Sequence, residues 1–396
     1  FYAAVEIRDK PGLAQLPVAV GGIGMISTAN YVARRWGVRS AMPGFVGQQL
    51  CRRGPEFGMP KAELVFVKPD FEKYTAVAEI ARAIFREYDP RPRAGSLDEA
   101  TLDLTAYLQR RARLGSHDLA RFAESGAAES AAAAGAAAAE LLGDGDGDEE
   151  PAAAWDDDAA DGAAADGPVD RALAEEVVHE IRERVAAATG GLTSSAGIGH
   201  SRMAAKVAAD IHKPNGQHCA GFSHDEVLAF LGPLSVRKLP GVGRVLEKEL
   251  SEVLGVTTIA ELRAELPRVF VAFSEGCADF LLRASHGGGG GADDDDADGD
   301  GGHQKGISCE RTFATTSDAA EHRAIIGALS ATLASQLAER GLRGGGVTLK
   351  LKTAAFDLLT RESSRGGAVA TEAQVRERAL ALYERELRTR AQRAVG

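Results

Sequence analysis

Two adjacent carboxylates, Asp98 and Glu99, stand in the stretch SLDEATLDLT at residues 96–105. Hard divalent cations such as Mg²⁺ prefer oxygen ligands of this kind and often share them with substrate phosphates. Two such ions can activate a hydroxyl and stabilise the leaving oxygen of a phosphoryl displacement, at a site that normally includes a third acid. The leucines predict a strand in which Asp98 shares a face with Leu102 and Leu104. A solvated turn or a salt-bridged pair is the alternative.

Two further stretches carry groups that can grip a triphosphate. In STANYVARRWGV, Thr28, Tyr31 and Arg34 are three residues apart and share one face if the stretch is helical. Arg34 brings a planar fork that suits phosphate oxygens. Lys206, in SRMAAKVAADIHKPNG, adds a point charge. The ordinary alternatives are a capped helix start with surface arginines and a solvated lysine.

Two patterns suit a nucleic-acid backbone. In LPGVGRVLEKEL at 239–250, Gly241 and Gly243 form a Gly-x-Gly turn that opens a helix, as in the hairpin of a helix-hairpin-helix element. Backbone N–H groups of such a turn can cradle one phosphate. In VTLKLKT, Lys350 and Lys352 alternate with apolar residues, which predicts a strand with one basic face. A tight turn between packed helices and a plain solvent face remain as alternatives.

The elements that must position these residues are read from hydrophobic periodicity. We expect strands at 1–7, 62–67, 308–313, 347–352 and 355–361. We expect helices at 71–88, 170–190, 201–213, 318–340 and 371–390, with short helical pieces around LPGVG. The last block therefore reads as a small α+β sheet domain.

The net charge of −11 comes from an uneven distribution of acidic residues along the chain. Acidic residues are concentrated in two Ala/Gly/Asp-rich tracts, which have too little apolar bulk to order themselves. The rest of the chain carries net positive charge, which is compatible with a phosphate-rich partner. The four cysteines show no metal or disulfide spacing, and no apolar run is long enough to predict a membrane span.

Together these stretches resemble a Y-family DNA polymerase of the DinB/kappa type. The resemblance rests on FYAAVE, STANYVARRWGVRSAMPGF, LVFVKPDFEKYT, SLDEA, RMAAKVAADIHKPNGQ, VRKLPGVGRVLEKEL, SCERTF and VTLKLKT, which occur in the family's order. It implies an α+β, multidomain, right-handed polymerase with palm, fingers, helical thumb and C-terminal little-finger domain.

The resemblance also implies domain boundaries. We expect the palm at 1–9, 71–128 and 168–215, the fingers at 10–70, the thumb with its helix-hairpin-helix at 216–286, and the little finger at 303–396. A disordered insertion is expected at 129–167 and an acidic linker at 287–302. The first palm strand is expected to be N-terminally truncated, and the little finger to lack its last strand.

The family's functional residues carry over position by position. The resemblance implies catalytic and metal-binding roles for Asp98 and Glu99, triphosphate contacts for Thr28, Tyr31, Arg34 and Lys206, a steric gate against the ribose 2′-OH for Tyr2, and DNA contacts for Gly241, Gly243, Lys350 and Lys352. The family's third acid is expected just before Phe1. Thr101 replaces a usual tyrosine, His200 replaces a common asparagine, and 52–62 is an insertion.

The implied activity is translesion synthesis, in which two Mg²⁺ ions support transfer of an incoming dNTP to a primer 3′-OH. The implied partners are primer–template DNA and the dNTP, with a sliding clamp bound through segments outside this chain, and no membrane. The kappa resemblance implies the nucleus. The alternative is a catalytically inactive homologue that binds primer–template DNA as a scaffold.

Overall fold

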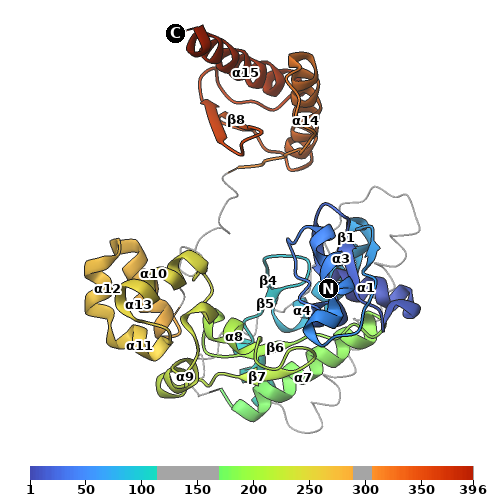
Figure 1. Cartoon of the computed structure of the whole chain (residues 1–396). Helices are drawn as coiled ribbons and strands as arrows, with labels where there is room; N and C mark the ends of the chain where they lie inside the picture. The colour runs from blue at the N-terminus through green and yellow to red at the C-terminus, as the bar shows by residue number, and fades with distance from the viewer. Residues whose placement is uncertain (114–168, 289–305, 396) are drawn as a thin grey trace. The chain divides into compact units, whose positions relative to one another are not determined.

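The chain forms two units, which Figure 1 colours from blue to red along the sequence. The computed structural model describes residues 1–113, 169–288 and 306–395. The units are Phe1–Asp294 and Asp295–Gly396. The predicted insertion at 129–167 and nearly all of the predicted linker at 287–302 lie outside the described residues. No helix in the described ranges is both long and apolar enough to cross a bilayer.

The N-terminal stretch is a helix, so the first palm strand predicted at 1–9 is wrong. Helix α1 spans Tyr2–Asp9 and buries Ala3, Val5 and Glu6. A short apolar run cannot distinguish a strand from a helix by periodicity alone. Here the two alanines favour the helix, because alanine has the highest helix propensity.

The segment that follows builds a small mixed sheet of order β2-β1-β3. Its strands are β1 (Val18–Gly21), β2 (Ile26–Ala29) and β3 (Val65–Val67), with β1 antiparallel to β2 and parallel to β3. The helical elements are η1 (Pro11–Leu13), α2 (Tyr31–Arg35), α3 (Gly44–Arg52) and η2 (Gly54–Phe57). Ala19, Ile26 and Leu64 are buried in the core between them.

Two long helices, α4 (Phe71–Tyr88) and α7 (Arg171–Ala188), pack against each other and agree with the predicted helices. Around them lie α5 (Thr105–Arg113), α8 (Arg202–Ala208), the antiparallel strands β4 (Arg93–Ala94) and β5 (Ala100–Thr101), and the parallel strands β6 (Ala196–Ile198) and β7 (Gln217–Cys219). Ile84, Val177 and Ile198 are buried in their shared core.

A cluster of short helices follows, shown in yellow and orange in Figure 1. It comprises α9 (His224–Leu231), η4 (Val236–Lys238), α10 (Arg244–Leu254), α11 (Ile259–Ala264), α12 (Leu266–Ala272) and α13 (Glu275–Ser285). Capping boxes of Ser223 with Glu226 and of Thr258 with Glu261 begin α9 and α11. Leu250, Ile259 and Leu281 are fully buried in one core, which matches the helical character predicted for the thumb.

The C-terminal unit packs a hairpin on two helices. Its elements are α14 (Ala319–Glu339), β8 (Val347–Lys352), β9 (Leu358–Ser363) and α15 (Glu372–Val395). Both predicted helices and the strand at 347–352 are present. The strand predicted at 308–313 is wrong, because these residues pair with no strand in the described part of the chain.

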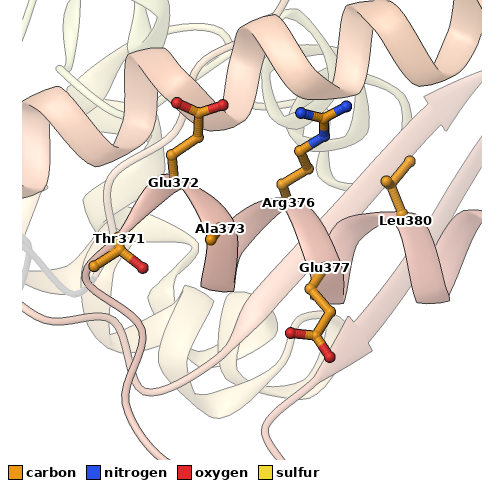
Figure 2. Close-up of a pocket in the computed structure, with 6 residues that line it drawn as sticks. All are labelled: Thr371, Glu372, Ala373, Arg376, Glu377 and Leu380. Carbon is orange, nitrogen blue, oxygen red and sulfur yellow. The ribbon is translucent and has the colours of Figure 1, made fainter.

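Figure 2 shows a pocket of about 550 Å³ on the first turns of α15. Its lining residues are Thr371, Glu372, Ala373, Arg376, Glu377 and Leu380. None of them is a predicted site residue, so the pocket has no part in the site described below.

Candidate functional site

The acidic pair lies in the turn of the short β4–β5 hairpin. Asp98 and Glu99 are both exposed, and Ser96 Oγ donates a hydrogen bond to Asp98 Oδ1 at 2.8 Å. The predicted strand over 96–105 is wrong, because strand pairing there is confined to Ala100–Thr101. The apolar face assigned to Asp98 is wrong as well. An exposed carboxylate avoids the cost of burying a charge, so it needs no permanent cation beside it.

A lysine from α8 neutralises the second acid of the turn. Lys206 Nζ forms an ion pair with Glu99, and both side chains are about half exposed. The structure therefore brings this predicted triphosphate ligand to the acids. Exposed pairs of this kind add little stability, so Lys206 can exchange Glu99 for another anion at small cost.

The side chains of Asp98, Arg34 and Lys213 come from different segments of the chain. Each lies near enough to the backbone nitrogen of Phe1 to act electrostatically there. Leu97, next to Asp98 in sequence, packs in the same apolar cluster as Phe1. The acidic turn therefore lies near the start of α1, and Arg34 and Lys213 lie in the same neighbourhood.

Lys213 is the member of this group that sequence reasoning missed. It follows α8 and pairs with Asp210 at 3.3 Å. The next residues are held by Arg182, whose guanidinium donates to Asn215 Oδ1 at 2.7 Å and to Gln217 Oε1 at 3.2 Å. The signal was present in the motif KPNGQ, which served in the sequence analysis only as a helix stop and as part of the family resemblance.

The predicted phosphate ligands near residue 30 come from a strand and a helix, so the expectation of one helical face is wrong for Thr28. Thr28 lies on β2, while Tyr31 and Arg34 lie on α2. The Arg34 guanidinium lies 4.9 Å from the centre of the Tyr31 ring, and Arg34 Nε donates to the Ala29 carbonyl at 3.0 Å.

Tyr31 and Thr28 differ in their surroundings. The Tyr31 ring is 50% exposed and can reach a ligand. Thr28 Oγ1 is buried and has no hydrogen-bond partner within the part of the chain that the structure describes. A buried hydroxyl without a partner is costly, which fits a position that a ligand completes.

Tyr2 lies in a group of aromatic rings where α1 meets α4. Its ring stacks on Tyr74 with the centroids 4.5 Å apart and the planes 11° apart. Phe71 meets Tyr2 edge-on at 5.6 Å. Tyr2 and Leu97 both pack against one apolar cluster, so the tyrosine lies in the neighbourhood of the acidic turn.

The Gly-x-Gly turn has one glycine that the backbone requires. Gly241 has a φ of +96°, and a Cβ there would lie 2.7 Å from Phe280 Cζ. Gly243 is the N-cap of α10 with a φ of −83°, and a Cβ there would meet nothing within 4 Å. Arg237 donates a hydrogen bond to the Val242 carbonyl and closes the turn. The open backbone around Gly243 leaves room for a phosphate.

The basic strand has the predicted faces. Lys350 and Lys352 are exposed on β8, while Val347 and Leu349 pack into the core of the C-terminal unit. Lys352 Nζ lies 4.6 Å from the centre of the exposed Phe356 ring. The strand therefore presents two positive charges and an aromatic ring to solvent.

The donor set fits a hard divalent cation in part. Asp98 and Glu99 supply exposed carboxylate oxygens on adjacent residues, which suit such a cation. Glu99 is already paired with the ammonium group of Lys206. Among the described residues, no three His, Cys, Asp or Glu side chains gather closely enough to hold a metal by themselves. A cation bound here would therefore need further oxygen ligands, such as those of a phosphate.

Three family models match the chain. The impB/mucB/samB family model matches residues 1–210, the IMS family HHH motif matches 224–256, and the impB/mucB/samB family C-terminal domain matches 304–396. The HHH match includes the Gly-x-Gly turn, where the sequence predicted such a motif.

Curated relatives are named as DNA polymerases. DNA polymerase kappa of Mus musculus is 36% identical over 391 residues, covering 95% of this chain and 44% of the mouse protein. DNA polymerase IV of Alkalilimnicola ehrlichii is 30% identical over 393 residues, covering 97% of this chain and 87% of that protein. The chain thus spans less than half of the mouse kappa protein.

A solved structure shares the fold. It is a chimera of the Y-family DNA polymerases Dbh and Dpo4, with a TM-score of 0.64 and 18% identity, and the match covers 99% of this chain and 92% of the chimera. The likeness confirms the predicted fold class, an α+β right-handed polymerase with palm, fingers, thumb and little finger.

Proposed function

Since the chain belongs to the impB/mucB/samB family, that is, to the Y-family DNA polymerases of the DinB/kappa type, we propose that it is the polymerising part of a translesion DNA polymerase. Its substrates are an incoming dNTP and primer–template DNA. The observation that carries the proposal is that the adjacent acids Asp98 and Glu99 stand exposed in one turn, where Lys206 of α8 pairs with Glu99. Two solved Dbh structures with this fold are titled ternary complexes, which supports a nucleotide and DNA as ligands.

The acidic turn is the catalytic centre in this proposal. Asp98 and Glu99 would hold divalent metal, which we take to be two Mg²⁺ ions completed by a third acid. Such metal, when bound, lowers the pKa of the primer 3′-OH and neutralises triphosphate charge. Ser96, which donates to Asp98 Oδ1, keeps that carboxylate oriented toward the substrate.

The cations and hydroxyls around the turn bind the triphosphate. Tyr31 and Arg34 present a phenol and a guanidinium from one helix turn, and Thr28 supplies the buried hydroxyl that lacks a partner. Lys206 pairs with Glu99 of the turn, and Lys213 pairs with Asp210 at 3.3 Å. We assign both lysines to the triphosphate, because exposed pairs of this kind exchange their anion at small cost.

Other residues contact the sugar of the nucleotide and the DNA. Tyr2 is the steric gate that excludes the ribose 2′-OH, since its ring lies in the neighbourhood of the acidic turn. Gly241 and Gly243 shape the hairpin that holds a DNA phosphate. Lys350 and Lys352 lie along the backbone of the duplex.

The domain assignment follows the predicted boundaries, with 1–9 as a palm helix instead of a strand. We place the fingers at 10–70, the thumb at 216–286 and the little finger at 303–396. A sliding clamp and nuclear location are proposed from the kappa relatives alone. The relatives' names favour an enzyme over an inactive scaffold.

Primer extension by the full-length protein tests the proposal. The assay uses Mg²⁺, all four dNTPs, and an undamaged template beside one with a bulky base adduct, with Asp98→Ala as the variant. We expect incorporation on both templates, its loss in the variant, and equal DNA affinity in both proteins. Strong residual incorporation by Asp98→Ala would remove the metal assignment. Tight DNA binding by the wild type without any nucleotide incorporation would support the alternative, a catalytically inactive scaffold that binds primer–template DNA.

A further inference from the structure

A buried carboxylate lies behind the aromatic group of the site. Glu6, on α1, is 2% exposed. Lys73 Nζ lies 2.6 Å from Glu6 Oε1, and Lys10 Nζ lies 3.7 Å from Glu6 Oε2. Burying a charge is costly unless it is paired and hydrogen-bonded, so these two lysines balance Glu6 without explaining why a carboxylate stands there.

The other partner of Glu6 is a tyrosine hydroxyl. Tyr74, on α4, is fully buried, and its hydroxyl donates a hydrogen bond to Glu6 Oε1 at 2.9 Å. Burial, followed by this hydrogen bond to Glu6, raises the pKa of Tyr74 to about 12. Tyr74 therefore remains a neutral donor at physiological pH, and its ring is tied at the hydroxyl end.

The tied ring supports Tyr2. The two rings are nearly parallel, at 11°, with centroids 4.5 Å apart, and Phe71 meets both edge-on at 5.6 and 6.0 Å. A ring that is stacked on one face and met at its edge by another has little freedom to tilt. The orientation of Tyr2 therefore depends on that of Tyr74, which Glu6 and the lysines fix.

We propose that Glu6 is a positioning residue for sugar selection. It anchors the hydroxyl of Tyr74, and the Tyr74 ring holds Tyr2 at the angle that excludes a ribose 2′-hydroxyl. This inference rests on the proposed role of Tyr2 as the gate. Glu6 itself touches neither nucleotide nor metal in this scheme, and it acts only through the Tyr74 ring.

The chain offers a matched control in Tyr88. Like Tyr74 it is buried on α4, and its hydroxyl donates to a carboxylate, Glu180, at 2.6 Å, while Arg184 donates to that hydroxyl at 2.7 Å. Its ring packs on Tyr107 and belongs to a different core. Tyr88→Phe thus removes the same kind of bond without touching the gate.

The experiment measures kcat/KM for dNTP and rNTP addition by the full-length protein and takes their ratio. The variants are Tyr2→Ala, Tyr74→Phe, Glu6→Gln and Tyr88→Phe, each checked by thermal unfolding. We expect Tyr2→Ala to lower the ratio most. Tyr74→Phe and Glu6→Gln should each lower it by about threefold to tenfold, because rNTP addition rises while dNTP addition is kept. Tyr88→Phe should leave it unchanged.

The outcomes separate the two claims. If Tyr2→Ala lowers the ratio but Tyr74→Phe and Glu6→Gln behave like Tyr88→Phe, the role of Glu6 is refuted and the gate stands. If Tyr2→Ala leaves the ratio unchanged, the gate assignment itself fails, and the role of Glu6 fails with it. A general loss of stability would lower dNTP and rNTP addition together and would refute positioning as well.

Discussion

Two antiparallel hairpins carry opposite charges in this protein, and they present those charges by different means. In β8–β9 each strand has six residues, and six residue pairs are in register. The alternation of the strand puts Lys350 and Lys352 outward while leucines pack inward. In β4–β5 each strand has two residues, and the acids stand in the turn. Their positions depend on Ser96 and Lys206 rather than on strand alternation.

The difference shows what each hairpin can tolerate. In β8 the alternation of the backbone decides which side chains face solvent. That arrangement persists when one side chain is replaced, because the remaining residue pairs still hold the strand. An acid oriented by one hydroxyl and one exposed cation is easier to disturb. We therefore expect changes at the acidic hairpin to alter catalysis and changes at the basic hairpin to alter DNA affinity.

The largest effect is expected at Asp98. Asp98→Asn should lower the single-turnover rate of dNTP addition at saturating primer–template by about a thousandfold, because a preorganised charge at the reacting groups is lost. The dissociation constant for DNA should stay within about twofold of the wild-type value, since the acid does not hold the duplex. A rate close to wild type, or a large loss of DNA affinity, would refute the claim that the acidic hairpin acts in catalysis and not in DNA binding.

Ser96→Ala should give the next largest effect. It removes the 2.8 Å hydrogen bond to Asp98 Oδ1, and losing an outer partner of a metal-binding group typically costs about tenfold or more in activity or metal affinity. Rapid-quench measurements at several Mg²⁺ concentrations should show a higher Mg²⁺ requirement. Ser194→Ala serves as the control, because the hydrogen bond that Ser194 accepts from Arg182 uses its backbone carbonyl. Equal Mg²⁺ profiles for both variants would assign Ser96 no role.

The basic hairpin should respond in affinity alone. Lys350→Gln combined with Lys352→Gln should weaken primer–template binding, with the salt dependence of log K falling by about one unit per lysine. Lys61→Gln, at an exposed lysine in the predicted insertion, is the charge-matched control. Fluorescence anisotropy between low and moderate salt measures the slope. An unchanged slope in the double variant would remove β8 from the DNA interface.

The smallest effects concern stability. Lys206→Gln should change the free energy of unfolding by less than about 1 kcal/mol, because its pair with Glu99 is exposed. Arg361→Gln should cost about 2 kcal/mol, because Arg361 Nη2 lies 2.7 Å from the carboxylate of Glu386, which is 5% exposed. Urea unfolding measures both. A greater loss for Lys206→Gln would mean that the acidic turn is held more firmly than the basic hairpin.

Much of this architecture could be predicted from sequence because long elements have a clear period. The helices α4, α7 and α14 and the strand β8 occur where they were expected. The strand at 1–7 was wrong because a short, mostly apolar stretch suits either structure. The strand at 308–313 was wrong because a strand needs a partner, which a single sequence does not identify.

The site was less predictable than the fold. The family was predicted from motifs and is confirmed, and those motifs pointed to Asp98 and Arg34. Lys213 was missed because its position depends on the loop after α8, which Arg182 holds through Asn215. Glu6 was not singled out, because 1–7 was expected to be a strand and because its burial depends on contacts with Tyr74 and Lys73 of α4. Both depend on tertiary contacts that no local pattern encodes.

Metal binding at the acidic turn is the most direct test of the account. Mn²⁺ binding to the full-length protein is measured by titration calorimetry, with primer–template DNA that lacks a 3′-OH and the matching dNTP both bound. The wild type should bind two ions per complex, and Asp98→Asn should lose at least one of them without releasing DNA. Equal stoichiometry and affinity in the two proteins would show that the acidic turn is not the metal centre.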